Sequence, residues 1–328
     1  MKIKKIKKRT HMMYVLVAIG FFMQSSCSDD PEPTPVIEPE TPGVEMPDAP
    51  VKVTTLVQNF QASDGLSVDD EGSIYASDYG DFMGTEVLKV NPNTAAIEVA
   101  VNNLSAPTGN TIDASGTIFV VNNVRRVREG SDELQGDVLR VLDDGTRTVI
   151  ATLPGFPAGI TLDEDGNAYV SNFFFPGVHK ITPDGEVTVF AQDNRLFGGV
   201  GIDFDDSGNL FVGNFSTGAI LKISPDSTIE ILATIPTVRE GVVIGYLTYF
   251  DATIYATAPG EHVIYSVSMS GEVKILAGTG DKESKDGPLL DASFNTPNGI
   301  TADPNKKVLY VTAGGDNDGG ALRVISLD

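Results

Sequence analysis

The sequence predicts an all-β protein, a six-bladed β-propeller with four-stranded blades in which an N-terminal strand closes the last blade. Three observations lead to this prediction. A pattern of a short apolar run, a tight Asp/Gly turn and an alternating run with an aromatic residue recurs six times. A second turn flanked by alternating runs follows in each unit, so each unit of roughly 45 residues contains four short strands. After residue 50 there is no helical periodicity and no glycine-rich nucleotide-binding motif.

The first 26 residues have the pattern of an export signal. Lys and Arg dominate residues 1–9, and the apolar run 12–23 is too short to span a hydrocarbon core of ~30 Å comfortably. Cys27, the single cysteine, follows directly after two serines. This arrangement resembles the bacterial lipoprotein signal, so we expect 1–26 to be removed as a signal peptide and Cys27 to be lipidated. The alternative is an ordinary signal followed by an incidental cysteine.

Residues 27–50 predict an acidic, Pro-rich tether. The segment contains no Lys or Arg and little apolar surface to bury, so we expect an extended spacer. Ser28, Asp29 and Asp30 resemble the acidic signal that sends lipoproteins of Bacteroidetes-type bacteria to the outside of the outer membrane. The expected location is therefore the outer membrane, lipid-anchored and facing the cell exterior. Alternatively, these acidic residues only begin the tether.

Residues 51–328 form the single predicted propeller domain. In the D-x-x-G turns of the first hairpins, Gly supplies the position with positive φ and Asp caps the local backbone; the copies at 245–258 and 299–313 are weaker. The six copies occupy residues 65–78, 109–122, 159–172, 201–214, 245–258 and 299–313.

The second hairpin of a unit is marked by turns at 142–145, 182–185, 224–227 and 268–271. The last unit ends on its third strand, at 321–328. We expect its fourth strand at the other end of the domain, where residues 52–58 resemble the outer strands of the other blades. Such closure hides two strand edges that would otherwise invite aggregation.

Residues 277–312 resemble an NHL repeat. They contain, in order, G-x-G, D-G, A-x-F-N-x-P-x-G-I, D and L-Y-V. The other five copies share only a G-I-x-x-D-x-x-G-x-L-Y-V skeleton with gluconolactonases, regucalcin-like lactonases and strictosidine synthase-like propellers. The chain is thus similar to NHL-repeat six-bladed propellers of the gluconolactonase/regucalcin-like superfamily, carried on a bacterial lipoprotein. The resemblance implies the fold rather than one activity, because one fold hosts many functions.

Composition limits the classes of function. The net charge of −22 argues against nucleic-acid binding, which needs a Lys/Arg surface to neutralise phosphates. One Cys and three His exclude a thiolate zinc cluster, and the domain has too few histidines for a three-His zinc centre. The expected partners are the membrane, through the N-terminal lipid, and an unidentified protein, glycan or small molecule. We expect a monomer.

Candidate metal ligands lie where the inner strands begin, at one mouth of the central channel. The residues that precede the leading glycines are Asp64, Thr108, Ala158, Val200, Ile244 and Asn298. The resemblance to lactonases implies oxygen ligands from four blades at about this level, holding a divalent metal that polarises a lactone and activates water. Asp64 and Asn298 alone match, so they are the candidate ligands for Ca²⁺ or another divalent cation, and no cofactor is assigned firmly. The alternative is that both hydrogen-bond to neighbouring loops.

Other polar residues recur or stand in pairs. Asp78, Asn122, Asn172 and Asn214 end the second strand in four blades. Their repetition favours hydrogen bonds to the following loop over a ring of ligands. His179 and His262 begin third strands two blades apart. They are candidates for an acid–base pair, with partly exposed strand residues as the alternative.

Two features that are not repeated predict a binding face. The predicted loop 122–137 is longer than its counterparts and holds Arg125, Arg126 and Arg128, which suit carboxylate, phosphate or sulfate groups. Pairing with acidic residues of the same loop is the alternative.

The matching loop of the next blade is filled by aromatic rings. Phe173, Phe174 and Phe175 lie there, and further rings near the same mouth are Phe82, Phe156, Phe197 and Phe215. They are expected to wall a pocket or a partner surface. Packing between blades is the alternative.

Two functions of different classes follow. One is a surface-anchored binding module that acts through its loop-rich mouth. The other is a divalent-metal-dependent hydrolase of lactones or esters, which needs three or four oxygen donors at the inner strands. Two such donors are present, so the sequence favours the binding module. No catalytic residue is assigned, and enzyme activity remains the alternative.

Overall fold

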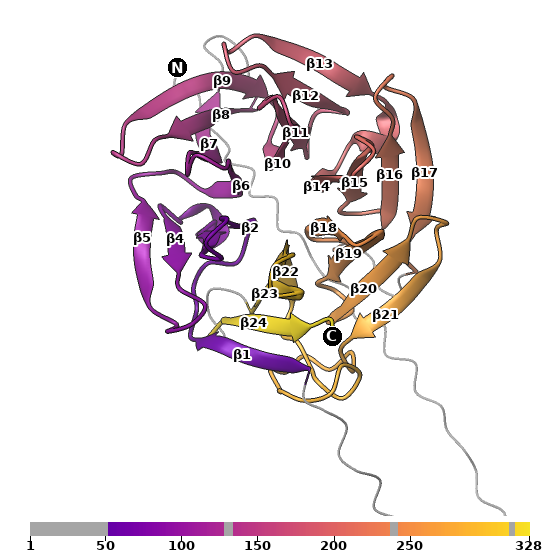
Figure 1. Cartoon of the computed structure of the whole chain (residues 1–328). Helices are drawn as coiled ribbons and strands as arrows, with labels where there is room; N and C mark the ends of the chain where they lie inside the picture. Colours follow the sequence, from indigo (N-terminus) through magenta and orange to yellow (C-terminus); the bar gives the residue numbers. More distant parts are fainter. Residues whose placement is uncertain (1–51, 128–133, 237–241, 315–318) are drawn as a thin grey trace, which may run out of the picture. The chain divides into compact units, whose positions relative to one another are not determined.

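The six sequence repeats form six antiparallel sheets of four strands, arranged as blades around a central axis (Figure 1). The structure is a computed structural model that describes residues 52–127, 134–236, 242–314 and 319–328. Within these residues the predicted all-β, six-bladed propeller is confirmed. The predictions for the signal peptide, Cys27 and the tether lie outside the described residues.

The first three blades follow the chain in order. Blade 1 contains β2 (Leu66–Val68), β3 (Ile74–Ser77), β4 (Val87–Val90) and β5 (Ile97–Val101). Blade 2 contains β6 (Pro107–Ile112), β7 (Ile118–Val127), β8 (Leu134–Val141) and β9 (Arg147–Pro154). Blade 3 contains β10 (Pro157–Leu162), β11 (Ala168–Asn172), β12 (Gly177–Ile181) and β13 (Val187–Gln192).

The remaining blades complete the ring. Blade 4 contains β14 (Gly199–Phe204), β15 (Leu210–Asn214), β16 (Ala219–Ile223) and β17 (Ile229–Thr234). Blade 5 contains β18 (Leu247–Phe250), β19 (Thr253–Ala258), β20 (Val263–Ser268) and β21 (Val273–Ala277). Blade 6 contains β22 (Pro297–Asp303), β23 (Val308–Ala313), β24 (Ala321–Ser326) and β1 (Val53–Gln58).

Helical structure is minor. Two 3₁₀ turns, η1 (Gly80–Phe82) and η2 (Asn194–Leu196), are the helical elements in the described part of the chain. No helix among these residues is long and apolar enough to cross a membrane.

The hairpin turns form as the Asp/Gly pattern predicts. In blade 3 the Asp163 carboxylate accepts hydrogen bonds from the backbone N–H groups of Asp165 and Asn167, at 3.1 and 2.8 Å. Gly166 then takes a φ of 77°, which a residue with a side chain rarely adopts. The turn thus fixes which residues of β10 and β11 face each other.

Apolar residues fill the spaces between neighbouring blades. One cluster joins Phe119 and Val138 of blade 2 to Val170 and Ile181 of blade 3. The core is therefore a ring of inter-blade clusters around a polar axis. This arrangement leaves the loops at each end of the channel free to differ from blade to blade.

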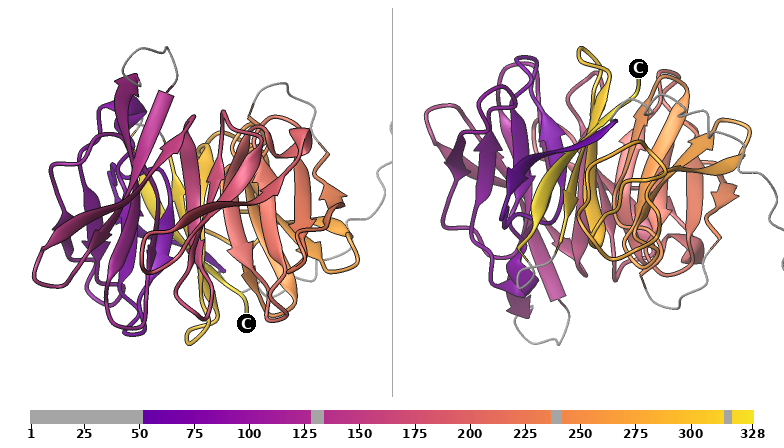
Figure 2. Two further views of the ribbon diagram at one scale, coloured as in Figure 1. Left: turned by 90° about the horizontal axis from the view of Figure 1, so that it is seen from above. Right: turned by 90° about the horizontal axis from the view of Figure 1, so that it is seen from below.

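The predicted closing strand is confirmed. β1 pairs antiparallel with β24, with Val53 opposite Ile325 and Gln58 opposite Ala321 (Figures 1 and 2). The loop that resembles the NHL repeat packs against this strand, since Gly287 and Val53 exchange backbone hydrogen bonds of 3.0 and 3.1 Å. Residues 52–58 therefore complete blade 6 as its outer strand.

A polar clamp reinforces the closure. The Asp286 carboxylate accepts hydrogen bonds from the backbone N–H and the hydroxyl of Thr55 on β1, at 3.1 and 2.8 Å. Its Oδ1 atom also lies 2.8 Å from the guanidinium of Arg323 on β24. Arg323 is fully buried and donates further hydrogen bonds to the carbonyl groups of Ser293 and Lys285. One acidic side chain thus joins both strands of the seam.

Candidate functional site

A pocket of about 630 Å³ opens at the channel mouth, on the end of the propeller where the inner strands begin. It lies at the level of the residues that precede the inner-strand glycines. Asp64, Thr108, Ala158, Val200 and Asn298 line it, as the sequence predicts. The remaining lining residues are Ser63, Tyr79, Asp81, Phe82, Phe156, Phe173, Phe174, Phe215, Val242, Tyr246, Pro259, Gly260, Thr296 and Gly314.

Aromatic rings form a continuous arc along one side of this pocket. The ring of Tyr79 lies 4.8 Å from that of Phe82, and Phe82 lies 5.8 Å from Phe156. Phe156 then contacts Phe174, with 6.2 Å between ring centroids. These rings come from a loop of blade 1, the connection between blades 2 and 3, and a loop of blade 3. The aromatic arc is therefore assembled from residues that are distant in the sequence.

The arc continues toward blade 4. Phe174 lies 4.9 Å from Phe173, which lies 5.3 Å from Phe215. Phe173 and Phe174 therefore line the pocket, whereas Phe175 packs against the His179 ring at 4.7 Å. Phe173 and Phe174 thus lie in the wall of a pocket as expected, whereas Phe175 is partly buried and packs within blade 3. Phe82 and Phe174 remain 45% and 48% exposed, so the arc faces outward.

Asn172 holds the loop that carries these rings. Its Oδ1 atom accepts hydrogen bonds from the backbone N–H groups of Phe156, Phe174 and Phe175, at 2.9 to 3.0 Å. Its Nδ2 atom donates to the carbonyl group of Pro154 at 2.7 Å. The expected structural role of the polar residues at the second-strand ends is confirmed at this position.

Asn214 repeats this arrangement one blade further on. Its Oδ1 atom accepts the backbone N–H groups of Ser216 and Thr217, and its Nδ2 atom donates to the carbonyl groups of Arg195 and Phe197. In both blades the side chain that ends the second strand fixes the loop at the mouth.

The floor of the pocket is polar. The Tyr246 hydroxyl donates a hydrogen bond of 3.0 Å to Oδ1 of Asp64. The Nδ2 atom of Asn298 lies 3.5 Å from Oδ2 of Asp64 and donates to the carbonyl group of Ser63 at 2.9 Å. Burial, and then the neighbouring Asp64 carboxylate, raise the pKa of Tyr246 well above its ordinary value. The tyrosine therefore stays protonated and donates at neutral pH.

Tyr246 corrects the register predicted for blade 5. The Gly65 N–H donates to the carbonyl group of Thr108, and the Tyr246 N–H donates to that of Asn298 in the same way. Tyr246 thus stands where the other blades have their leading glycine. Ile244, predicted at the mouth, is instead fully buried in an apolar cluster. The sequence 245–258 lacks a Gly in its turn, so it gives no marker of this one-residue shift.

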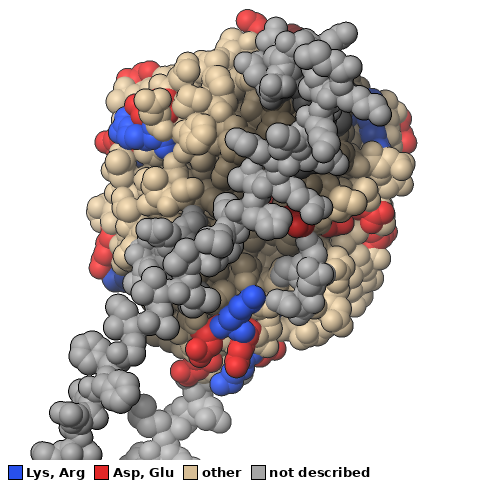
Figure 3. All heavy atoms as spheres, turned by 180° about the vertical axis from the view of Figure 1, so that it is seen from behind, with Lys and Arg blue, Asp and Glu red and all other residues tan. Residues whose placement is uncertain are grey.

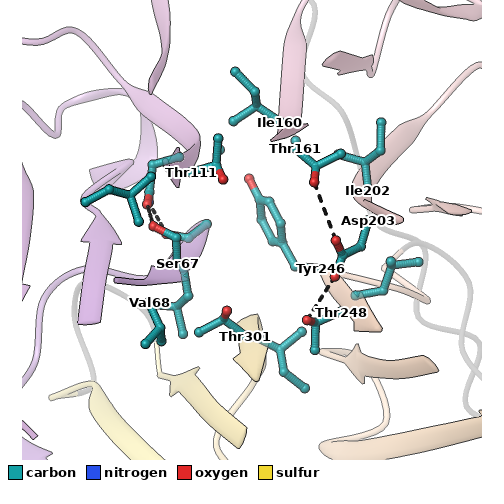
Figure 4. A pocket seen from close by; sticks show the side chains of 18 residues that line it. Ser67, Val68, Thr111, Ile160, Thr161, Ile202, Asp203, Tyr246, Thr248 and Thr301 are labelled. Atoms are coloured by element: carbon teal, nitrogen blue, oxygen red, sulfur yellow. Dashed lines mark hydrogen bonds between the residues drawn. The ribbon is translucent and has the colours of Figure 1, made fainter. Parts of the chain in front are cut away.

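A narrower channel of about 150 Å³ continues below Tyr246 (Figure 4). Its lining is largely polar and includes the hydroxyl groups of Ser67, Thr111 and Thr301. Asp203 is partly buried in its wall and accepts hydrogen bonds from Thr248 and Thr161, at 3.1 and 3.4 Å, and from two backbone N–H groups. Burial raises the pKa of the Asp203 carboxyl group.

The predicted Arg loop is largely a hairpin extension. β7 runs to Val127 and β8 begins at Leu134, with Arg126 opposite Gln135. Much of the span 122–137 is therefore strand, because the pairing of blade 2 continues past the end of the other hairpins. The backbone of Arg125 and Arg126 lies in β7, and Arg128 lies outside the described residues.

Both domain histidines are buried, contrary to the expectation of partly exposed strand residues. His179 is 4% exposed beneath Phe175, and its burial lowers the pKa of the imidazole. The Nδ1 atom of His262 accepts a hydrogen bond from the backbone N–H of Thr296 at 3.2 Å. Neither side chain lines the mouth pocket. Both contribute to packing, because loops fold over the beginnings of their strands.

Asp64 and Asn298 do meet, as expected for adjacent blades. The Asn298 amide nitrogen, rather than its oxygen, faces the carboxylate. Blades 3 and 4 contribute the apolar side chains of Ala158 and Val200 at this level. In the described part of the chain, no three His, Cys, Asp or Glu residues gather closely enough to hold a metal ion.

The charged surface differs from the mouth lining. On the face opposite to the view of Figure 1, the Lys, Arg, Asp and Glu side chains that are visible lie mainly toward the rim (Figure 3). Among the described lining residues of the mouth pocket, the charged ones are Asp64 and Asp81. Aromatic and aliphatic groups provide most of the remaining wall.

Comparisons with known proteins agree with the fold. No protein-family model matches the chain. A strictosidine synthase-like 3 protein of Arabidopsis thaliana is 31% identical over 121 residues, which is 32% of this chain and 30% of that protein. The matched region is thus less than a third of that relative's length.

Solved structures resemble the chain over most of its length. An auxiliary nutrient binding protein from Bacteroides thetaiotaomicron matches with a TM-score of 0.67 and 16% identity, over 84% of this chain and 76% of that one. A gluconolactonase from Xanthomonas campestris matches with a TM-score of 0.59 and 15% identity, over 89% and 99% of the two chains. At these identities the likeness shows a shared six-bladed propeller fold.

Proposed function

We propose that the protein is a surface-anchored binding module that captures a small, largely apolar organic molecule in the mouth pocket. The aromatic arc carries this proposal. Six rings from the mouth loops, Tyr79, Phe82, Phe156, Phe173, Phe174 and Phe215, line one cavity whose volume is typical of small-molecule sites. Half-exposed rings in a concave wall gain free energy when a ligand covers them.

The polar floor gives such a ligand an orientation. Asp64 and Asn298 lie at the base of the pocket, while the aromatic arc covers its side. A few convergent polar groups within an apolar wall are the usual means by which a pocket selects one pose. The auxiliary nutrient binding protein shares the fold, which supports a role in uptake or retention of a nutrient molecule.

A neutral fluorescent probe tests the proposal. The chain has no Trp, so the emission of N-phenyl-1-naphthylamine can be followed without interference from indole. We expect saturable binding, and we expect Phe174→Ala to weaken it about tenfold because the ring forms the centre of the arc. Ile275→Ala is the matched control, since Ile275 is also 48% exposed but lies on an outer strand. Equal affinities for wild type and both variants would place the probe elsewhere and contradict the proposal.

A second candidate is a divalent-metal-dependent hydrolase of lactones or esters. The observation that favours it is the contact between Asp64 and Asn298 on adjacent blades, and the fold is shared with a gluconolactonase. Ca²⁺ is the expected cation, because both side chains offer hard oxygen donors. Calorimetry with Ca²⁺, Mg²⁺, Mn²⁺ and Zn²⁺, followed by a lactone panel, tests this. One tightly bound ion that Asp64→Ala abolishes, with metal-dependent turnover, would favour the hydrolase over the binding module.

The surface anchor is a separate part of the proposal. It rests on the single cysteine that follows the predicted signal segment. Cys27→Ala should move the protein from the membrane fraction to the soluble fraction. Protease treatment of intact cells should then degrade the wild-type protein if the anchor faces the exterior. Continued membrane retention of the variant would exclude lipidation as the anchor.

The arginines of the blade 2 hairpin add a test of ligand charge. Replacing Arg125, Arg126 and Arg128 with Ala should weaken capture of an anionic ligand and leave the melting temperature unchanged. The neutral probe serves as the control, because its binding should not depend on these residues.

Gel filtration of the same samples tests the expected monomeric state.

A further inference from the structure

We infer that Tyr246 is a specificity-determining residue whose ring closes the axial channel beneath the mouth pocket and sets how deep a ligand reaches. The inference rests on the proposed function, because it takes the mouth pocket as the ligand site. It adds a limit on ligand length and names the residue that imposes it.

The position of Tyr246 in the ring is unusual. The other five blades have glycine at the corresponding position: Gly65, Gly109, Gly159, Gly201 and Gly299. These glycines allow close packing of the inner strands, since a side chain on Gly201 would collide with the backbone of Tyr246. Tyr246 is the exception, and its side chain points into the channel (Figure 4).

The ring separates two compartments of opposite character. Above it lies the mouth pocket of about 630 Å³, with its aromatic wall. Below it lies the channel of about 150 Å³, lined by hydroxyl groups, by buried Asn110 and by partly buried Asp203. Among the described lining residues, Tyr246 alone belongs to both cavities. The tyrosine is therefore the partition between an apolar ligand site and a polar channel.

The partition is held in place at both ends. Its backbone N–H donates to the carbonyl group of Asn298 on the neighbouring blade, and its hydroxyl donates to Asp64 at 3.0 Å. The side chain is only 6% exposed. Swinging the ring away would break a partly buried hydrogen bond and uncover apolar surface, both of which cost free energy. A ligand in the mouth pocket therefore meets a fixed floor.

This floor predicts which ligands fit. An apolar molecule gains affinity with length only until its end reaches the tyrosine ring. A longer chain must leave the pocket toward solvent. The wild-type protein is thus expected to gain no further affinity from chain length beyond this limit.

A series of ω-phenylalkan-1-ols tests the depth limit by displacement of the fluorescent probe. In the wild type we expect affinity to rise about fourfold per added methylene while the chain is buried, and then to stop rising. We call the chain length at which affinity stops rising the limiting length. Tyr246→Gly, which installs the residue of the other five blades, should increase the limiting length. Tyr246→Phe keeps the ring without its hydroxyl group, so its limiting length should match that of the wild type.

A second measurement does not depend on ligand binding at the mouth. p-Cresol has the shape of the side chain that Tyr246→Gly removes. It should raise the melting temperature of that variant more than it raises that of the wild type, because it refills the axial space. Equal shifts in the two proteins would overturn the placement of the ring as a plug.

The outcomes separate the two proposals. If the wild type binds the series and the limiting length is the same in Tyr246→Gly, the role of Tyr246 is contradicted and the proposed binding function is not. If no member of the series displaces the probe from the wild type, both the proposed function and the role of Tyr246 are contradicted. A limiting length that increases in Tyr246→Gly and stays unchanged in Tyr246→Phe supports both.

Discussion

The seam of blade 6 and the channel mouth use their side chains in opposite ways. At the seam, the carboxylate of Asp286 is hydrogen-bonded to Thr55 and Arg323, and the Arg323 guanidinium is fully buried. At the mouth, Phe82 and Phe174 remain about half exposed and contact mainly other rings. The seam pairs its charged side chains with each other and with the backbone, whereas the mouth leaves apolar surface available.

This difference separates residues that serve stability from residues that serve binding. The seam joins two strands from opposite ends of the domain, so specific polar bonds are needed to hold them in register. Exposure of the aromatic arc to water costs free energy, and packing among the rings offsets only part of this cost. Changes at the seam should therefore affect stability, and changes at the mouth should affect ligand capture.

The largest effect is expected from removing the closing strand. Deleting residues 52–58 removes buried Val53 and the β1–β24 ladder, and exposes the edge of β24. We expect a loss of more than ~5 kcal/mol in the free energy of unfolding, with aggregation on heating. Deleting residues 28–50 leaves β1 in place and is the control. Similar thermal unfolding of the two deletions would show that ring closure contributes little.

Breaking the polar clamp should have the next largest effect. Arg323→Met removes the guanidinium that donates to the carbonyl groups of Ser293 and Lys285 and pairs with Asp286, so we expect a loss of about 3 kcal/mol, measured by urea unfolding. Lys307→Met is the control, because its ion pair with Asp328 is exposed and contributes little. The neutral probe should still bind folded Arg323→Met with wild-type affinity. A loss of probe affinity in Arg323→Met would contradict the division between a seam that serves stability and a mouth that serves binding.

Asn172 serves both stability and binding, because it is buried and holds the Phe174 loop at the mouth. Its replacement should therefore have an intermediate effect. Asn172→Ala removes one acceptor from three backbone N–H groups, so we expect about 2 kcal/mol of destabilisation and weaker probe binding through the displaced Phe174 loop. The control is Asn209→Ala, since Asn209 bonds to Asp205 in a turn outside the pocket. Unchanged probe affinity in Asn172→Ala would mean that the loop keeps its shape without this side chain.

The smallest effect concerns pH. Burial lowers the pKa of His179 in the folded state, while the unfolded chain keeps an ordinary value of about 6.5. Below that pH the unfolded state binds more protons, so stability decreases as the pH falls, by at most ~1.4 kcal/mol per pH unit from this group. His179→Gln should reduce the slope of stability between pH 7 and pH 5. Parallel pH profiles for wild type and variant would show that the buried imidazole does not control this range.

The sequence predicts the fold well because each repeat carries its own local markers. The Asp/Gly turns define the hairpins, and the similarity of residues 52–58 to other outer strands predicts the seam. Asp64, Asn298, Phe173 and Phe174 are also placed correctly at the mouth. These positions follow from strand order, which the repeats reveal.

The features that the sequence does not predict depend on packing between blades and loops, which the repeat pattern does not describe. Blade 5 lacks a Gly in its first turn, so the one-residue shift that brings Tyr246 to the axis leaves no trace in the pattern. The burial of His179 and His262 results from loops folding over their strands, which periodicity does not describe. The burial of Arg323 also leaves no mark in the repeat pattern, because its partners lie in a loop about 30 to 40 residues away in the sequence.

Ring closure also has a consequence for the order of folding. Val53 pairs with Ile325, and these residues lie near opposite ends of the domain. The last blade therefore stays incomplete until residues 321–326 have been synthesised. Until then the partly folded chain has two open edges that other chains can pair with, so it is most prone to aggregation at this stage. Because such long-range pairing slows folding, closure of blade 6 is expected to be the rate-limiting step of maturation.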